Sequence, residues 1–289
     1  MPAAVFLLGP GFIGGEIIDL LISNYKVATL IRRESAVVDY ANLGIEAVVA
    51  EQLCFPTQHT ARGDCKSDTI FDDEQPEQIN ALPDSASHRL IDLAIIRAGQ
   101  ELASNAKMAI MIPPLIYGVT TRENRLSIQL PTLIRYSIKH GYPEQIGKGL
   151  AVWNQIHVKD LARGYMVLLH WMERAPVAEV AENPYFFCEN GQELSWGECA
   201  TEVGRILKET GRIDRSTPKS IPEKQWGDLF GDYSGMMVGS NARNRANRLR
   251  KLGWAPLEKE TFASLAEDEI PIIAKETGEL TGYASVVAS

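Results

Sequence analysis

Three glycines near the N-terminus have the spacing of a phosphate-binding turn. The turn Gly9-Pro10-Gly11-Phe12-Ile13-Gly14 stands between an apolar run at 4–8 and residues with helical spacing. In this position the first glycine permits a tight turn, the second lets a pyrophosphate approach the backbone, and the third allows close helix packing. The helix start adds free N–H groups and a positive dipole end. We therefore predict that Gly9, Pro10, Gly11, Phe12, Ile13 and Gly14 bind a nucleotide; a purely structural glycine turn is the alternative.

Two arginines lie where the choice between NAD and NADP is made. Arg32 and Arg33 directly follow a second apolar run at 26–31. An acidic residue at this point binds the ribose of NAD, whereas guanidinium groups suit the 2′-phosphate of NADP through charge and bidentate geometry. Arg32 and Arg33 therefore favour NADP, and Glu34, the next residue, keeps NAD open. Two ordinary surface arginines are the alternative interpretation.

The first fifty residues alternate between strand and helix patterns. The expected elements are a strand at 4–8, a helix with Ile17, Ile18, Leu21 and Ile22 on its inner face, a strand at 26–31, a short helix at 37–43 closed by Gly44, and a strand at 45–50. This order is typical of the first half of a doubly wound parallel sheet. The fold class is therefore α/β, a Rossmann-type domain followed by a smaller C-terminal α/β lobe.

The alternation stops between residues 51 and 84. This segment contains Pro56, Gly63, Pro76 and Pro83, many charges and no run of four apolar residues. Because central strands of a parallel sheet are continuous apolar runs, the composition predicts an irregular segment without buried strands. Regular elements are expected again after this segment. The first is a helix at 85–102 with Leu90, Ile91, Ala94, Ile95 and Ala98 on its inner face. The elements that follow are a strand at 107–112, a helix at 126–140 interrupted near Pro131, a strand at 155–158, a helix beginning at Asp160, a strand at 185–188, and a helix opened by a Ser195–Glu198 capping box.

Composition and charge exclude several classes of partner. The net charge of −8 over 289 residues argues against general affinity for nucleic acid or anionic membranes. One basic cluster, of Arg243, Arg245, Arg248, Arg250 and Lys251, is interpreted as a solvated helix face. No apolar stretch is long enough to span a membrane, and the first residues lack the basic start of a signal peptide. Four widely separated cysteines argue against zinc or disulfides, so we expect no metal and a cytoplasmic protein with reduced thiols.

Four stretches together resemble the extended short-chain dehydrogenase/reductase family, in its epimerase/dehydratase and NmrA-like branches. They are the glycine turn, Pro113-Pro114-Leu115-Ile116-Tyr117-Gly118, Ile156-His157-Val158-Lys159-Asp160-Leu161-Ala162, and Leu252-Gly253-Trp254-Ala255-Pro256. The resemblance implies that Pro113, Leu115 and Ile116 hold the nicotinamide amide. It also implies a dinucleotide-binding domain over 1–118, with 51–84 as an irregular insert. The substrate lobe would cover 119–289, with 150–180 returning to the first domain.

The chain departs from this family in its proton-transfer motif. Family members use a Tyr-x-x-x-Lys pair, and none of the tyrosines here has a lysine four residues later. By position, His88 would take the place of the tyrosine and Asp92 that of the lysine. Histidine can act as a general acid near neutral pH, which makes His88 a weak catalytic candidate. A surface or capping histidine is the alternative.

The fourth and fifth strands of the family are also missing. Two strand–helix units do not fit into residues 51–84, so the junction around 51–67 is either a natural deletion or a splice or gene-model junction. We expect the sheet to run from the third, second and first strands directly to the later ones. The loss would expose apolar faces of the first strand and of the helix at 85–102, which a homodimer could cover.

Three functions remain open from the sequence. The first is an NAD(P)-dependent oxidoreductase or epimerase-like protein that acts on a small carbonyl or alcohol substrate. The second is a non-catalytic NADP-binding sensor of the NmrA-like type, which fits the loss of Tyr-x-x-x-Lys. The third is a cofactor-independent isomerase or cyclase on the same scaffold. No residue spacing beyond 118 fixes the substrate.

Overall fold

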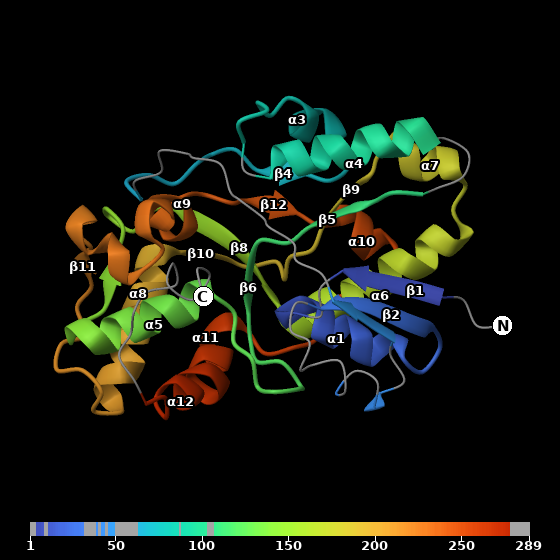
Figure 1. The fold of residues 1–289 in the computed structure, drawn as a ribbon. Coiled ribbons are helices and arrows are strands. Elements are labelled where there is room, and N and C mark those ends of the chain that lie inside the picture. Colours follow the sequence, from blue (N-terminus) through green and yellow to red (C-terminus); the bar gives the residue numbers. More distant parts are fainter. Residues whose placement is uncertain are drawn as a thin grey trace.

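The computed structural model describes residues 4–8, 11–31, 39, 42–43, 46–49, 63–86, 88–102 and 107–277. Figure 1 shows a sheet with its helices on one side of the molecule and a larger, mainly helical lobe on the other. The predicted ligand-binding residues Gly9, Pro10, Arg32 and Arg33 lie outside the described residues, as does most of the short helix expected at 37–43. None of the helices in the described part is long and apolar enough to cross a membrane.

The first sheet forms as the sequence predicts. Strands β1 (Ala4–Leu8), β2 (Lys26–Ile31) and β3 (Glu46–Val49) are parallel, with β2 in the middle. Helix α1 (Phe12–Leu21) connects β1 to β2. Its predicted inner residues Ile17, Ile18 and Leu21 are buried with Val27, whereas Ile22 is partly exposed after the helix end. Helical periodicity thus placed the inner face of α1 correctly.

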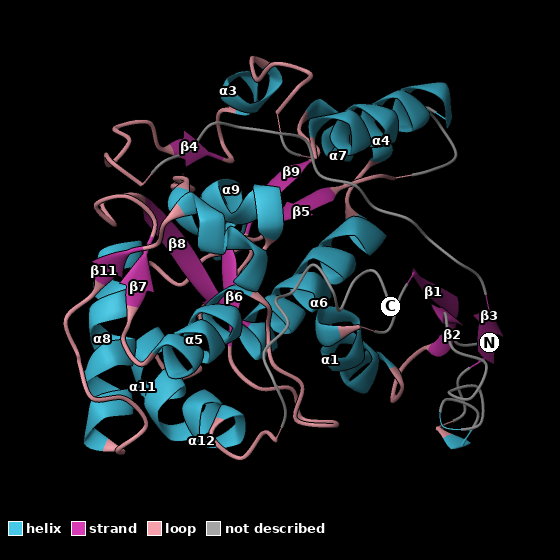
Figure 2. Cartoon of the chain, turned by 60° about the vertical axis from the view of Figure 1, so that its left-hand side comes forward, coloured by secondary structure: helices cyan, strands magenta, loops and turns pink. Residues whose placement is uncertain are grey.

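The expected direct continuation of this sheet is wrong. Strand β5 (Ile110–Ile112) pairs in parallel with β9 (Tyr185–Phe187), and among the described strands β1 pairs with β2 alone. Figure 2 shows β1 to β3 standing apart from β5 and β9. Between β3 and β5 the described residues supply one strand, β4 (Phe71–Asp72), and it pairs outside both sheets. The two sheets are therefore joined through helix α6 (Val158–Arg174), whose side chains belong to the apolar clusters beside both.

Helix α4 (Arg89–Leu102) is rotated relative to the prediction. Ile95 and Ile96 pack on β5 and β9, but Leu90 and Ile91 are exposed at 60% and 48%. Ala94 is exposed as well, and Ala98 is half-buried. The rotation follows from Arg89, which is buried and donates to the Tyr185 hydroxyl (3.0 Å) and to the Asn80 carbonyl (3.3 Å). Since both faces of this helix carry apolar residues, the apolar pattern alone did not determine which one is buried.

The irregular segment is anchored to the C-terminal part of the chain. Its described part, residues 63–84, contains a two-residue strand, β4 (Phe71–Asp72), parallel to β12 (Asn244–Arg245), and helix α3 (Pro76–Asn80). Asp73 is fully buried and accepts hydrogen bonds from the backbone N–H groups of Phe187 and Arg248. Burial raises the pKa of this carboxyl to about 6. The prediction of no buried central strand holds for residues 63–84, because β4 lies outside the first sheet.

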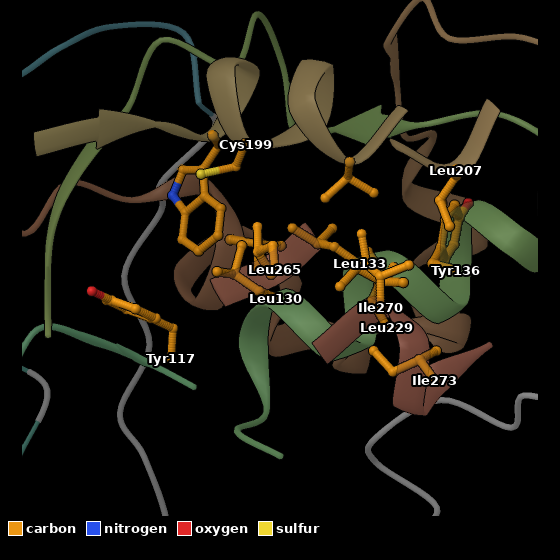
Figure 3. Packing of buried hydrophobic residues seen from close by; sticks show 14 of the residues in the cluster. Tyr117, Leu130, Leu133, Tyr136, Cys199, Leu207, Leu229, Leu265, Ile270 and Ile273 are labelled. Carbon is orange, nitrogen blue, oxygen red and sulfur yellow. The ribbon is translucent and has the colours of Figure 1, made fainter. Parts of the chain in front are cut away.

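The C-terminal lobe is built around a second small sheet. Strand β8 (Val152–His157) lies between β6 (Leu115–Tyr117), parallel to it, and β10 (Glu193–Ser195), antiparallel to it. Side chains from α5 (Gln129–His140) and α8 (Trp196–Glu209) form the core shown in Figure 3. The remaining elements are β7 (Glu144–Gln145), β11 (Lys219–Ser220), α7 (Val177–Glu182), η2 (Glu223–Asp228), η3 (Gly231–Tyr233), α9 (Ser234–Gly239), α10 (Asn247–Lys251), α11 (Thr261–Ser264), η4 (Leu265–Glu269) and α12 (Ile270–Ile273).

Two local predictions in this lobe have different outcomes. The capping box at the start of α8 is present, with Ser195 and Glu198 satisfying each other's backbone N–H groups. The interruption expected near Pro131 is absent, since α5 begins at Gln129 and Pro131 lies in its first turn. A proline is tolerated there because the first N–H groups of a helix have no intrahelical acceptor.

The basic cluster is bound to the protein itself rather than forming a solvated face. Glu193 pairs with both Arg243 and Arg245, Glu189 pairs with Arg250, and Glu74 pairs with Lys251. Arg248 lies over the Phe186 ring, 3.8 Å from its centre, and donates to backbone carbonyls. These cations fix the C-terminal residues against the rest of the chain.

Candidate functional site

The start of α1 provides uncapped backbone donors beside open space. Gly11 is the N-cap, no described side chain caps the helix, and its first turn carries no acidic residue. A Cβ atom added to Gly11 would meet no atom within 4 Å. Because the first N–H groups of a helix lack intrahelical acceptors, an anion can bind them. Of the predicted turn, Phe12, Ile13 and Gly14 are described with Gly11, and all four line one cavity.

This cavity has a volume of about 700 Å³ and lies between the two sheets. Val5 and Leu7 of β1 form one wall, and Ala109 and Met111 at β5 form another. Helix α6 contributes further apolar side chains. The cavity therefore occupies the gap between the unpaired edges of β1 and β5, and it extends to the start of α1.

The segment after β5 divides its side chains between the cavity and the core. Pro114 and Ile116 line the cavity, opposite the glycine turn. Leu115 and Tyr117 are both 1% exposed and belong to the core of the C-terminal lobe. Successive residues of a strand point to opposite faces, which accounts for this division. Of the predicted nicotinamide residues, the structure brings Ile116 to the cavity, while Pro113 and Leu115 are outside its lining.

The loop after β6 is attached to α1. The carboxylate of Glu16, which is 6% exposed, accepts from the backbone N–H and from the hydroxyl of Thr121. One turn further along the helix, Asp19 forms an ion pair with Arg122 (2.6 Å). Burial raises the pKa of Asp19, and the Arg122 guanidinium opposes that shift. These contacts hold the loop that leads to Leu126–Gln129, which line the cavity next to the glycine turn.

A buried polar group supports the end of β6. Gly118 has φ of 96°, and a Cβ atom there would lie 2.2 Å from Nε2 of His157, so this position requires glycine. Its N–H donates to Oε1 of Glu269 (3.0 Å), to which the Ser264 hydroxyl also donates (3.2 Å). Glu269 is fully buried in the π-helical turn η4, and burial raises its pKa to about 7. Burial also lowers the pKa of His157.

The two C-terminal motifs of the family resemblance contact each other. The Asp160 carboxylate accepts from the backbone N–H groups of Leu257 (2.8 Å) and Glu258 (3.1 Å), and Arg163 pairs with it. The Trp254 indole N–H donates to the Asp160 carbonyl (3.1 Å). Asp160 therefore has a structural role, fixing the start of α6 to the segment after α10.

The remaining predicted residue, His88, is not brought to the cavity. It is exposed, has φ of 64° and lies immediately before α4, where its carbonyl accepts from the Asp92 N–H (3.1 Å). This is the capping position that the sequence left as an alternative. Asp92 is half-buried on α4, and burial raises its pKa.

Two cavity-lining residues, Ser127 and Tyr165, were not singled out by the sequence analysis. Ser127 Oγ is buried and has no hydrogen-bond partner among the described residues. Tyr165, on α6, lines the cavity, and burial raises the pKa of its phenol to about 12. The sequence placed Tyr165 only within the helix that begins at Asp160. No sequence signal pointed to Ser127.

Comparison with known proteins confirms the fold class. No family model matches the chain. A curated relative, the oxidase ucsJ of Acremonium sp, is 26% identical over 203 residues, a match that spans 66% of this chain and 58% of that protein. The chain therefore covers less than two thirds of the length of this relative.

Solved structures similar over most of the chain include three enzymes named for nucleotide sugars. The UDP-glucose 4-epimerase of Thermotoga maritima has a TM-score of 0.61 at 13% identity, covering 93% of this chain and 98% of its own. The UDP-glucuronic acid 4-epimerase of Bacillus cereus, solved with NAD, has 0.59 at 12%, covering 94% and 99%. The dTDP-glucose 4,6-dehydratase of Bacillus anthracis, also with NAD, has 0.60 at 13%, covering 95% and 97%. The predicted Rossmann-type α/β fold is confirmed.

Proposed function

We propose that this chain binds a nicotinamide dinucleotide at the start of α1, with NADP preferred over NAD. The observation that carries the proposal is the uncapped start of α1 at Gly11, with Pro114 and Ile116 on the facing wall of one cavity. The NAD complexes of the similar epimerase and dehydratase support the same class of cofactor. The basic pair Arg32 and Arg33 is the reason for preferring NADP, through the 2′-phosphate.

Each part of the site has a defined task in this proposal. The first N–H groups of α1 bind the pyrophosphate, and the absence of a side chain at Gly11 allows its close approach. Pro114 and Ile116 present an apolar surface to the nicotinamide ring. When bound, the dinucleotide would supply hydride-transfer chemistry. Glu16 and Thr121 hold the loop after β6 against α1, beside the site.

We propose an oxidoreductase or epimerase-like activity on a small carbonyl or alcohol compound, in the cytoplasm. The similarity to an oxidase and the epimerase-type fold support this assignment. The sequence lacks Tyr-x-x-x-Lys, which favours a second candidate function, a non-catalytic NADP-binding regulator of the NmrA-like type. His88 has no role in either proposal, because it lies outside the cavity lining.

Two measurements on the purified chain separate these functions. NADPH, NADP and NADH are titrated by calorimetry, and NADPH consumption is then followed with a panel of aldehydes and ketones. Binding with consumption supports the oxidoreductase, and binding without consumption of NADPH by any compound supports the regulator. Absence of dinucleotide binding would reject both functions and leave a cofactor-independent isomerase.

A further inference from the structure

Gly118 lies between the two segments through which the C-terminal lobe lines the cavity. Pro114 and Ile116, which line the cavity, come a few residues before it. Leu126–Gln129, which also line the cavity, follow it after the loop that Glu16 holds against α1. The contacts that fix Gly118 therefore fix the point from which both segments reach the cavity wall.

The backbone N–H of Gly118 is bound by a buried carboxyl group. It donates to Oε1 of Glu269 (3.0 Å), and Glu269 is fully buried in the π-helical turn η4. A Cβ atom at Gly118 would lie 2.2 Å from Nε2 of His157, so the backbone is closely packed on β8 at this point. The position of Gly118 thus depends on Oε1 of Glu269 remaining in place.

The described groups around Glu269 supply no positive charge. They are Asp268 on its own turn, Ser264 on α11, the Tyr117 phenol on β6 and, across Gly118, His157 on β8. The neighbouring helix α12 consists of Ile and Pro residues. Lys259 directs its ammonium group to Glu267 and Asp268 instead. Burial lowers the pKa of His157, which keeps this side chain neutral near pH 7.

An ionised Glu269 would be a buried charge without compensation. Its second oxygen, Oε2, is buried and has no hydrogen-bond partner among the described residues. Such a charge is relieved when water enters or when the group moves toward solvent. Either change competes with the hydrogen bond from Gly118 to Oε1. Burial accordingly raises the pKa of Glu269 to about 7, so the change in charge falls near neutral pH.

We propose that Glu269 makes dinucleotide binding sensitive to protons: its neutral form holds Gly118 in place, and its ionised form releases Gly118 together with both cavity-lining segments. This regulation rests on the proposed function, because those segments form one wall of the proposed dinucleotide site. A ligand that needs the ordered wall binds only the fraction of molecules with neutral Glu269, so its apparent affinity falls with that fraction. NADPH should therefore bind more weakly at pH 8 than at pH 6.

The first test is the NADPH affinity of the wild-type protein and of Glu269→Gln at pH 6 and pH 8, measured by calorimetry. Glutamine keeps an acceptor oxygen but cannot ionise. At pH 8 about one molecule in ten has neutral Glu269, so the wild-type protein should bind NADPH about tenfold more weakly than Glu269→Gln. At pH 6 the two proteins should bind it equally. The 2′-phosphate of NADPH itself titrates at about pH 6, which affects both proteins alike.

Glu267→Gln is the matched control. Glu267 lies on the same turn, is exposed and pairs with Lys259. This variant should lose NADPH affinity between pH 6 and pH 8 as the wild-type protein does. The same dependence on pH in the wild-type protein and in Glu269→Gln would overturn the inference.

Hydrogen exchange without dinucleotide separates this inference from the proposed function. The backbone amides of residues 118–126 are followed by mass spectrometry at both pH values. They should exchange several-fold faster in the wild-type protein than in Glu269→Gln at pH 8, and equally fast at pH 6. This difference without any NADPH binding rejects the proposed function and keeps the release of Gly118. NADPH binding with the same pH dependence in both proteins rejects the inference and keeps the proposed function.

The wild-type protein alone decides if Glu269→Gln does not fold. Relative to the exchange rates of an unstructured peptide of the same sequence, the protection of residues 118–126 should fall several-fold between pH 6 and pH 8. Unchanged protection across this range would overturn the inference.

Discussion

The carboxylate of Glu16 accepts two hydrogen bonds from Thr121, a residue 105 positions later in the chain. One comes from the Thr121 backbone N–H and the other from its hydroxyl, at 3.1 Å. Glu16 is on α1 directly after the glycine turn, and Thr121 is in the loop after β6. The pair thus joins the uncapped start of α1 to the segment that carries Pro114 and Ile116, which are the two sides of the proposed dinucleotide site.

Removing the hydrogen bonds between Glu16 and Thr121 should lower both the NADPH affinity and the free energy of unfolding. Glu16→Ala leaves the Thr121 N–H without an acceptor, so the free energy of unfolding should fall by about 1–3 kcal/mol. NADPH affinity should fall as well, because the loop loses its attachment to α1. Glu16→Gln retains one acceptor oxygen and should recover most of both losses. Chemical denaturation and calorimetry measure the two effects, and an unchanged NADPH affinity in Glu16→Ala would contradict the positioning role of this pair.

The protonation of Glu269 should make stability depend on pH. Its pKa is raised from 4.5 to about 7, so the folded state binds the proton more tightly than the unfolded state does. This contribution is fully present below pH 4.5 and is lost as pH rises to 7, and it amounts to about 3 kcal/mol. Glu269→Gln resembles the protonated form and should match the wild-type protein at pH 5 but be more stable at pH 8. Denaturation at both pH values measures this difference.

The neighbouring carboxylate provides the control for this pH effect. Glu267 lies on the same turn, is exposed and pairs with Lys259. Glu267→Gln should change the free energy of unfolding by a similar small amount at pH 5 and pH 8. If Glu269→Gln shows no pH-dependent gain over the wild-type protein, Glu269 does not hold a proton in the folded state near neutral pH.

The arginine pair should determine the choice of cofactor. Arg32→Ala with Arg33→Ala removes two guanidinium groups that would bind the 2′-phosphate, so NADP affinity should fall by about tenfold or more. NAD lacks this phosphate, and its affinity should change little. Calorimetric titration of both cofactors checks this selectivity. An equal loss of affinity for NADP and NAD would show that Arg32 and Arg33 do not bind the 2′-phosphate.

The exposed apolar face of α4 is the surface we propose for a homodimer. Leu90 and Ile91 are exposed at 60% and 48%, on the side of the helix away from its core contacts. Leu90→Glu should shift the protein from dimer to monomer in analytical ultracentrifugation, because a charge would be buried between the copies. Leu257→Glu, at a side chain that is 77% exposed, is the control and should leave the dimer intact. A wild-type protein that is monomeric at high concentration would contradict this surface.

The sequence was most informative where one local pattern determines the structure. The alternation over the first fifty residues predicted β1, α1, β2 and β3, since strand and helix periods differ and the glycine turn separates them. The Ser195–Glu198 capping box is likewise local, because its two partners lie within one helical turn. These features depend on neighbours in sequence, and all of them are present.

The sequence was less informative where contacts between residues far apart in the chain determine the structure. It predicted that residues 51–84 lack central strands, which holds for the described residues 63–84, but not that α6 would contact the cores beside both sheets. The rotation of α4 depends on the bond between Arg89 and Tyr185, which are 96 residues apart. Ser127 lines the cavity from the loop after β6, which Glu16 attaches to α1 across 105 residues. Each of these features follows from long-range packing rather than from spacing.

The most direct test of the central claim is the affinity for NADPH of two single alanine variants on α1. A Cβ atom at either Gly11 or Gly15 would meet no protein atom within 4 Å, so both variants should fold. Only Gly11 lies at the uncapped helix start where the pyrophosphate would bind. We predict that Gly11→Ala lowers NADPH affinity by about tenfold or more, while Gly15→Ala binds as the wild-type protein does. Wild-type affinity in Gly11→Ala would contradict the proposed dinucleotide site.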